Sequence, residues 1–263
     1  MNLKSKLVLA LLATSSAAFA QTAPAAPATP EVTYNVGVVS QYRYRGIAQT
    51  KGDPALQGGV DYANASGFYL GAWASTIKWI KDAALESGNA SAKQAKGPVE
   101  LDLYGGYKFE AAGVAYDVGY LRYQYQGNTY KDASSANVNA NTDEVYGAAT
   151  YGPATLKYSH AISNLFGYSD SKGSNYLDLS ATFDLGKGYS LVPHAGRQTI
   201  TNANGIYSYS DFALTLNKDL GDGLSANVAA IKTTADQALF TTLSSTSYNA
   251  AKNALVVGVK YSF

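Results

Sequence analysis

The sequence predicts an all-β chain that folds as a transmembrane antiparallel up-and-down β-barrel of about twelve strands, with short periplasmic turns and long extracellular loops. Three observations predict this fold. The last strand is amphipathic and ends on an aromatic residue, short alternating segments recur along the chain, and the connections between them alternate in length.

Residues 255–263 form the expected last strand. One face carries Leu255, Val257, Val259, Tyr261 and Phe263, and the other carries Gly258, Lys260 and Ser262. A last strand that is apolar on one side and closed by an aromatic residue is typical of outer-membrane β-barrels. We therefore interpret Val259, Tyr261 and Phe263 as the signal for the barrel-assembly machinery.

Alternation of apolar and polar residues marks eleven further segments. With the last strand, the set is 32–45, 55–63, 67–77, 99–109, 114–125, 144–151, 154–162, 175–183, 189–198, 211–218, 224–232 and 254–263. Most of these segments approach the length of about 9–11 residues that a tilted strand needs to cross a bilayer.

The connections between these segments alternate between short and long. The short ones are 64–66, 110–113, 152–153, 184–188 and 219–223, and the long ones are 46–54, 78–98, 126–143, 163–174, 199–210 and 233–253. Outer-membrane barrels have short periplasmic turns and long extracellular loops, and an even number of strands places both ends of the barrel in the periplasm. A soluble β-sandwich gives no reason for this alternation.

Residues 1–20 have the features of a secretory signal peptide. Lys4 and Lys6 precede an apolar stretch, and Ala18 and Ala20 form a small-x-small cleavage site. We therefore expect cleavage after Ala20.

The mature chain is expected to hold a leader and a single domain. Residues 21–31 are rich in Ala and Pro, and prolines obstruct both helix and sheet. Residues 32–263 form the barrel, which we expect in the bacterial outer membrane after export to the periplasm.

Composition excludes several classes of function. The chain has no cysteine, which excludes thiolate metal sites, and its net charge of +1 gives no basic field for nucleic acid. Two histidines, His160 and His194, are too few for a histidine-rich metal centre. No glycine-rich phosphate loop and no Gly-x-Ser-x-Gly elbow stands in the required context. We therefore expect no enzyme, no cofactor and no nucleic-acid partner.

Charged residues on the strands fall mainly on the face opposite the apolar one, so we expect them inside the barrel. The candidate pore-lining residues are Arg43, Arg45, Gln57, Asp61, Glu100, Asp102, Lys108, Asp117, Glu144, Lys157, Asp178 and Lys260. Two interpretations stay open. The charges form a salt-bridged filling, or they line a pore whose constriction opposes the two arginines to Glu100 and Asp102.

The first hairpin carries two specific expectations. Tyr42 and Tyr44 are expected to face outward, in the aromatic girdle of the first strand. Arg45 is expected to pair with Asp61 inside the barrel, across the first two strands.

Three further local expectations concern neighbouring segments. The pair Gly58-Gly59 leaves a notch that Trp73 is placed to fill. A change of parity near Arg122 indicates a bulge or a strand already above the membrane. Residues 82–86 favour one helical turn.

Three neighbouring stretches carry a family resemblance: SQYRYRGIAQT at 40–50, PALQGGVDY at 54–62 and SGFYLGAWAS at 66–75. Together they resemble the opening of the TorF family, proteobacterial outer-membrane proteins described as porins. The motif covers about the first third of the chain after the leader, and the remainder is similar only in its general barrel character. The resemblance implies a porin-like channel, and it supplies no substrate and no functional residues.

The expected function is a porin-like channel for passive diffusion of small hydrophilic solutes, set in outer-membrane lipid and lipopolysaccharide. The alternative is a closed or plugged barrel that acts through its extracellular loops as an adhesin, receptor or structural protein. The long polar loops at 78–98, 126–143 and 233–253 leave room for that alternative. The amphipathic last strand and the loop alternation argue against a soluble ligand-binding barrel.

Overall fold

The computed structural model describes residues 30–86, 96–134, 136–201, 205–242 and 248–263. The expected cleavage site at Ala18 and Ala20 lies outside these residues, as does most of the expected leader. Within the described residues, no helix is both long enough and apolar enough to cross a membrane.

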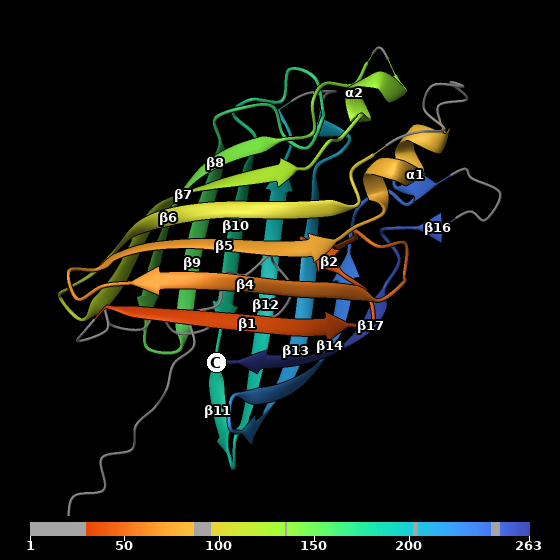
Figure 1. Ribbon diagram of the computed structural model, residues 1–263. Coiled ribbons are helices and arrows are strands. Elements are labelled where there is room, and N and C mark those ends of the chain that lie inside the picture. Colours follow the sequence, from red (N-terminus) through yellow and green to blue (C-terminus); the bar gives the residue numbers. More distant parts are fainter. Residues whose placement is uncertain (1–29, 87–95, 135, 202–204, 243–247) are drawn as a thin grey trace, which may run out of the picture.

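Twelve antiparallel strands close into a barrel (Figure 1), as the sequence predicts. Their bounds are β1 Glu31–Val39, β4 Ala55–Ala63, β5 Phe68–Thr76, β6 Val99–Ala111, β7 Val114–Tyr125, β8 Thr142–Tyr151, β9 Ala154–Ala161, β10 Asn175–Ala181 with β11 Phe183–Gly186, β12 Tyr189–Thr199, β13 Tyr209–Gly221, β14 Leu224–Thr233 and β17 Ala254–Ser262. Both β10 and β11 pair with β12, so together they form one strand that is interrupted at Thr182. The first and last strands, β1 and β17, pair with each other and complete the ring.

One end of the barrel, which we call the turn end, carries the short connections. Three of these are two-residue turns in which both residues have positive φ: Ala112-Gly113 (53° and 75°), Lys187-Gly188 (54° and 76°) and Asp222-Gly223 (51° and 81°). Such primed turns match the right-handed twist of paired strands and fix their register. The long connections lie at the opposite end, which we call the loop end.

The loop end carries the small elements of the fold. They are β2 Arg43–Tyr44, β3 Ile47–Ala48, α1 Trp79–Glu86, α2 Tyr130–Ala133, β15 Thr241–Thr242 and β16 Tyr248–Asn249. Figure 1 shows α1, α2 and β16 gathered at this end. The helix α1 includes the helical turn expected at 82–86 and begins three residues earlier.

The two faces of the strands follow the predicted parity. On β17, Leu255 is 65% exposed on the outward face, and Phe263 just beyond it is 64% exposed. On β6, Glu100 and Asp102 are buried inside the barrel at 2% and 3%. The apolar outside and the charged inside are therefore both confirmed for these strands.

The first strand is shorter than predicted. It ends at Val39 rather than at residue 45, and Tyr42 and Tyr44 are buried inside the barrel at 2% and 8% exposure. Their assignment to the outward girdle is wrong. The alternation of residues 40–45 does continue, but it belongs to the separate hairpin β2–β3, where each tyrosine hydroxyl finds a partner in the interior.

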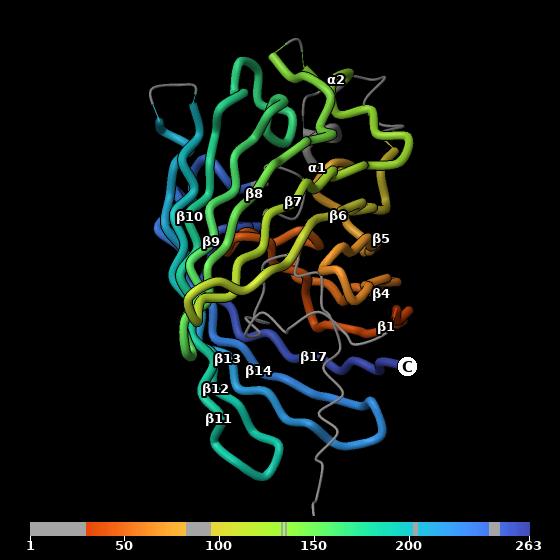
Figure 2. The backbone as a smooth tube through the Cα atoms, turned by 90° about the vertical axis from the view of Figure 1, so that its left-hand side faces the viewer, coloured from red at the N-terminus to blue at the C-terminus, as the bar shows by residue number. Residues whose placement is uncertain are grey.

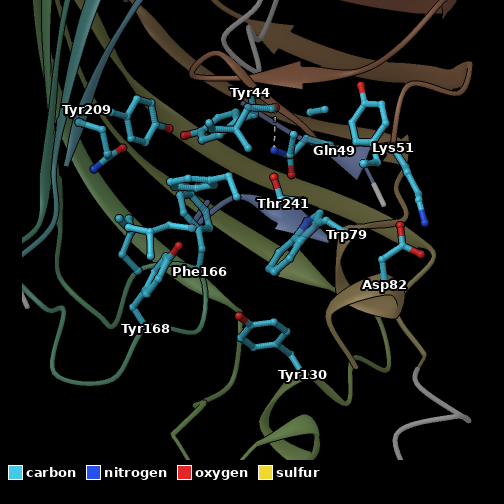
Figure 3. Close-up of a pocket in the computed structure, with 18 of the residues that line it drawn as sticks. Tyr44, Gln49, Lys51, Trp79, Asp82, Tyr130, Phe166, Tyr168, Tyr209 and Thr241 are labelled. Atoms are coloured by element: carbon cyan, nitrogen blue, oxygen red, sulfur yellow. Dashed lines mark hydrogen bonds between the residues drawn. The ribbon is translucent and has the colours of Figure 1, made fainter. Parts of the chain in front are cut away.

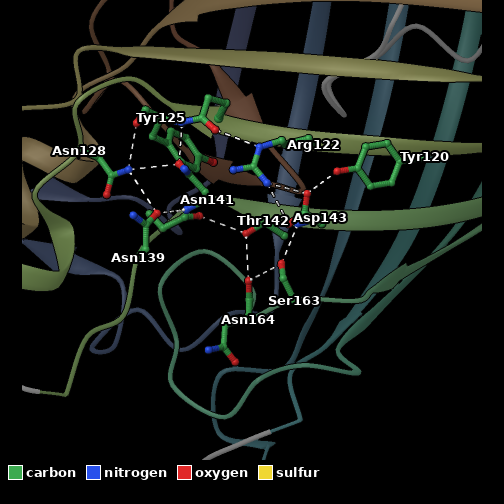
Figure 4. Close-up of polar contacts among 12 residues, drawn as sticks. Tyr120, Arg122, Tyr125, Asn128, Asn139, Asn141, Thr142, Asp143, Ser163 and Asn164 are labelled. Carbon is green, nitrogen blue, oxygen red and sulfur yellow. Dashed lines mark hydrogen bonds and ion pairs between the residues drawn. The ribbon is translucent and has the colours of Figure 1, made fainter.

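The expected bulge near Arg122 is also absent from β7, because this strand pairs with β6 and β8 in unbroken register. Arg122 lies toward the loop end, and its Nη1 donates to Oδ1 of Asp143 at 2.9 Å (Figure 4). Tyr120 donates to the same carboxylate oxygen. The charge of Arg122 is therefore neutralised locally without any change of strand register.

Candidate functional site

The hairpin β2–β3 lies inside the ring of strands, near the loop end (Figure 2). Its turn is Arg45-Gly46, with φ of 44° and 77°. A Cβ on Gly46 would lie 2.7 Å from Cβ of Asp211 on β13 and 3.2 Å from Cβ of Thr233 on β14, so the position suits glycine alone. The hairpin is thus packed closely against the wall that β13 and β14 form.

Arg45 joins this hairpin to strands β8 and β12, on the side of the lumen opposite β1. Its Nη1 and Nη2 donate to the two carboxylate oxygens of Glu144 on β8, at 3.0 and 2.8 Å. Nη1 also donates to Oε1 of Gln198 on β12, at 2.7 Å. All three side chains are at least 97% buried. The hairpin and these partners therefore fill the lumen at this level.

The predicted pairing of Arg45 with Asp61 is wrong, because Arg45 pairs with Glu144. Asp61 lies toward the turn end of β4, opposite Thr33 of β1, and accepts a hydrogen bond from Tyr104. The physical reason is the early end of β1: residues 40–48 leave the wall, so Arg45 no longer faces β4.

The predicted constriction is not formed either. Arg43 donates from Nη1 to the carbonyl oxygens of Gly46, Ala250 and Lys252, at 2.9–3.0 Å, and so ties the hairpin to the last loop. Glu100 instead accepts from the Tyr42 hydroxyl, at 2.6 Å.

The part of the lumen nearer the turn end is filled by tyrosines between opposite charges. The Tyr69 hydroxyl donates to Oδ1 of Asp117, at 2.6 Å, and also hydrogen-bonds to the Tyr146 hydroxyl. Nζ of Lys108 lies 5.0 Å from the centre of the Tyr69 ring, and Nζ of Lys157 lies 3.9 Å from that of Tyr146. These contacts are hydrogen bonds and cation–ring contacts, so tyrosine rings separate the charges at this level of the lumen.

A second cluster of polar side chains surrounds His194 on β12. Its Nε2 lies 2.7 Å from Oδ2 of Asp178, and its Nδ1 lies 3.6 Å from Oδ1 of Asp211. The Tyr176 hydroxyl donates to Oδ2 of Asp211, at 2.9 Å. The structure therefore places His194 on the inward face, which the sequence left open.

The candidate pore-lining residues all lie on the inward face of a strand or in the inward hairpin. These residues are Arg43, Arg45, Gln57, Asp61, Glu100, Asp102, Lys108, Asp117, Glu144, Lys157, Asp178 and Lys260. Their part in conduction stays a prediction.

On the loop side of the hairpin, a cavity of about 210 Å³ opens among the loops (Figure 3). We call it the vestibule. Its wall is rich in aromatic residues, which include Tyr44, Trp79, Tyr130, Phe166, Tyr168 and Tyr209. The ring centres of Trp79 and Tyr130 lie 5.2 Å apart, and those of Tyr44 and Phe166 lie 5.5 Å apart, both pairs edge to face.

Few charges border the vestibule in the part that the structure describes. Lys51 and Asp82 line it and carry opposite signs. Burial raises the pKa of the Asp82 carboxyl, whereas the positive charges of Lys51 and neighbouring lysines oppose that rise. Burial also raises the pKa of the Tyr168 hydroxyl, which therefore stays protonated.

Sequence reasoning missed the vestibule, because its wall comes from several loops that pattern analysis treats as polar connections. Trp79, Phe166 and Tyr168 all lie between strands. The available signal was composition: the chain has 22 tyrosines against 8 phenylalanines and 2 tryptophans.

Residues 21–263 match the model of a family described as "Bacterial protein of unknown function (Gcw_chp)". The chain belongs to the Gcw_chp family. No curated protein matches this Gcw_chp chain by sequence.

Among solved structures, this Gcw_chp chain is similar to the NanC porin, with 9% identity, a TM-score of 0.51, and coverage of 88% of this chain and 99% of NanC. It is also similar to the KdgM porin solved with disordered oligogalacturonate, with 11% identity, a TM-score of 0.49, and coverage of 88% and 98%. The COG4313 outer membrane channel from Pseudomonas putida F1 gives 14% identity, a TM-score of 0.44, and coverage of 90% and 95%.

The likeness to NanC shows that this Gcw_chp chain has the fold of an outer-membrane porin. It bears out the coarser part of the resemblance drawn from residues 40–75, a porin-like barrel. The TorF name stays a prediction.

Proposed function

We propose that the protein is an outer-membrane channel for small hydrophilic solutes, and that the hairpin β2–β3 closes its lumen in the conformation described here. The observation that carries the proposal is a closed twelve-stranded barrel with an apolar outer surface and an interior lined by charged and tyrosine side chains. Barrels of this kind conduct solutes where their polar interior is open to water.

An aromatic girdle at the turn end supports the membrane location. Outward rings stack there: Tyr34 and Phe263 have ring centres 5.7 Å apart, and Phe109 and Tyr116 have centres 5.1 Å apart. Such girdles lie at the membrane–water interface of outer-membrane barrels. In this arrangement the turn end is periplasmic, the loop end is extracellular, and lipid and lipopolysaccharide surround the wall.

We assign the gate to the hairpin because it stands outside the barrel ladder: side-chain contacts join it to the wall, and Ala48 N donates to the Ala250 carbonyl of the last loop at 3.0 Å. The strands β2 and β3 pair only with each other among the described residues. Movement of the hairpin would break the bonds from Arg45 to Glu144 and Gln198 while leaving every strand pair of the barrel intact.

Removal of the charged contact between hairpin and wall tests the channel and its gate together. The double variant Arg45→Met with Glu144→Leu removes the Arg45–Glu144 bonds without leaving either charge buried alone. In planar bilayers we expect current steps from the native protein, and more frequent or longer steps from the double variant.

The control is Arg122→Met with Asp143→Leu, which removes an ion pair away from the hairpin and should leave the currents as in the native protein. Equal currents from the native protein and the Arg45 double variant would contradict a gate at the hairpin. Silence from a folded, inserted native barrel would contradict the channel itself.

The closed barrel is the second candidate, and one observation favours it. Arg43, Glu144 and Gln198 are each at least 98% buried, so the lumen is filled at the hairpin. In that case the vestibule above the hairpin is a binding site and not a passage. Absence of current from the folded, inserted native barrel in the bilayer experiment would favour this candidate.

A further inference from the structure

The vestibule wall has an unusual composition for a site at the mouth of a polar barrel. Nine of the twenty described residues that line it are aromatic. Figure 3 shows Tyr44, Trp79, Tyr130, Phe166 and Tyr168 placed around one common space, although they come from the hairpin β2–β3 and from three separate connections between strands. A wall of this kind offers ring faces and edges to a ligand.

The rings already contact one another edge to face. Trp79 and Tyr125 have ring centres 5.3 Å apart at an interplanar angle of 89°, and Phe166 and Tyr123 have centres 5.2 Å apart at 77°. Aromatic pairs favour this geometry beyond simple burial of area. A further ring placed in the vestibule would therefore gain the same kind of contact.

Charge and size restrict the ligand further. Lys51 and Asp82 line the vestibule with opposite signs, which favours an uncharged ligand. A volume of about 210 Å³ lies below the range of roughly 300–1,000 Å³ that drug-sized ligands occupy. The space therefore suits a molecule of a single ring.

We propose that the vestibule binds small, uncharged aromatic molecules. This inference goes beyond the proposed function, because the vestibule ligand is distinct from the hydrophilic solutes of the channel. Binding at the vestibule is tested separately from conduction.

The two tryptophans of the chain provide a direct test. Protein with ¹⁵N-labelled tryptophan, held in lipid nanodiscs, gives one indole N–H signal from Trp79 in the vestibule wall and one from Trp73, which packs against Tyr42 with ring centres 5.6 Å apart. Trp79→Phe assigns the two signals. On titration with benzyl alcohol we expect a saturable shift of the Trp79 signal and a constant Trp73 signal.

Matched variants test the part played by the rings. Phe166→Leu keeps an apolar side chain but removes the ring, and should weaken benzyl alcohol binding about two- to tenfold. Phe109→Leu makes the same change on the outward face at the turn end and should leave binding unchanged. If Phe166→Leu does not fold, Tyr168→Leu replaces it with the same expected result.

Two comparison probes define the outcomes that overturn the proposal. Cyclohexylmethanol has nearly the shape of benzyl alcohol without the aromatic ring, and equal affinity for both would overturn aromatic recognition. A saturable response to glucose without one to benzyl alcohol would instead indicate a carbohydrate site. A barrel that conducts but shows no Trp79 shift overturns this proposal alone, whereas a barrel that binds but does not conduct overturns the channel alone.

Discussion

Arg45 is a buried guanidinium in the middle of a barrel, and such a charge needs an anion and further acceptors around it. The structure supplies both: the carboxylate of Glu144 binds it through two nitrogens, and Gln198 adds a third bond. The ring of Tyr176 lies 4.3 Å from the guanidinium carbon. Each partner comes from a different strand, so this residue joins several parts of the wall.

The substitution Arg45→Met should destabilise the barrel by about 3–5 kcal/mol, because it strands the buried carboxylate of Glu144. The double variant Arg45→Met with Glu144→Leu removes both charges, so its loss of unfolding free energy should be clearly smaller than that of Arg45→Met. Urea unfolding in lipid vesicles measures both changes. A single variant as stable as the native protein would show that Arg45 contributes little to stability.

At two positions on neighbouring strands, a glycine on one strand leaves space for an aromatic ring from the next. Gly59 on β4 lies opposite Trp73 on β5, and a Cβ on Gly59 would lie 3.2 Å from Cδ1 of Trp73. The notch predicted at this glycine is therefore confirmed. Gly71 on β5 lies opposite Tyr104 on β6 in the same way. Each glycine therefore leaves room for a ring from the neighbouring strand.

We predict that Gly71→Ala destabilises the barrel by about 1–3 kcal/mol, because its Cβ would lie 2.3 Å from the Tyr104 ring and force that ring away from Asp61. Gly147→Ala on β8 is the control, since a Cβ there meets no heavy atom within 4 Å. Thermal loss of the folded band in heat-modifiable gel electrophoresis compares the two. Equal midpoints would contradict the proposed fit between β5 and β6.

The end of β1 shows where pattern analysis fails at the level of an element. Alternation from residue 32 to residue 45 predicts one strand, but Arg45 and Gly46 both adopt positive φ and turn the chain back on itself. Side-chain parity is the same in a wall strand and in an isolated hairpin. The pattern therefore does not decide which strand a segment pairs with, whereas the primed turns of the turn end are placed correctly because their backbone requirements are local.

At the scale of the whole molecule, stability depends on closing the ring between the first and last strands. Tyr34 and Phe263 exchange two backbone hydrogen bonds, of 2.8 and 3.0 Å, beyond the ladder of β1 and β17. The Phe263 ring stacks on Tyr34 at 5.7 Å and on Tyr261 at 5.5 Å. The junction between β1 and β17, which we call the seam, thus ends in a small aromatic cluster at the turn end.

Replacement of Phe263 by alanine should destabilise the refolded barrel by about 1–3 kcal/mol, because two ring stacks are lost at the seam. Tyr151→Ala, at another outward position of the turn end that is 72% exposed, should change stability much less. Unfolding in urea, followed by tryptophan fluorescence, gives both values. Equal losses would indicate that any outward ring contributes as much as the seam.

The sequence by itself determined the number of strands, the outward and inward faces of strands such as β6 and β17, and the alternation of turns and loops, because these follow from local periodicity and turn chemistry. Only the tertiary structure decided that Arg45 binds Glu144 and that Trp79 and Phe166 share a vestibule. These partners are brought together by the closure of the ring and by loops that fold over one mouth of the barrel. Contacts across a lumen have no period along the chain, so no pattern in the sequence specifies them.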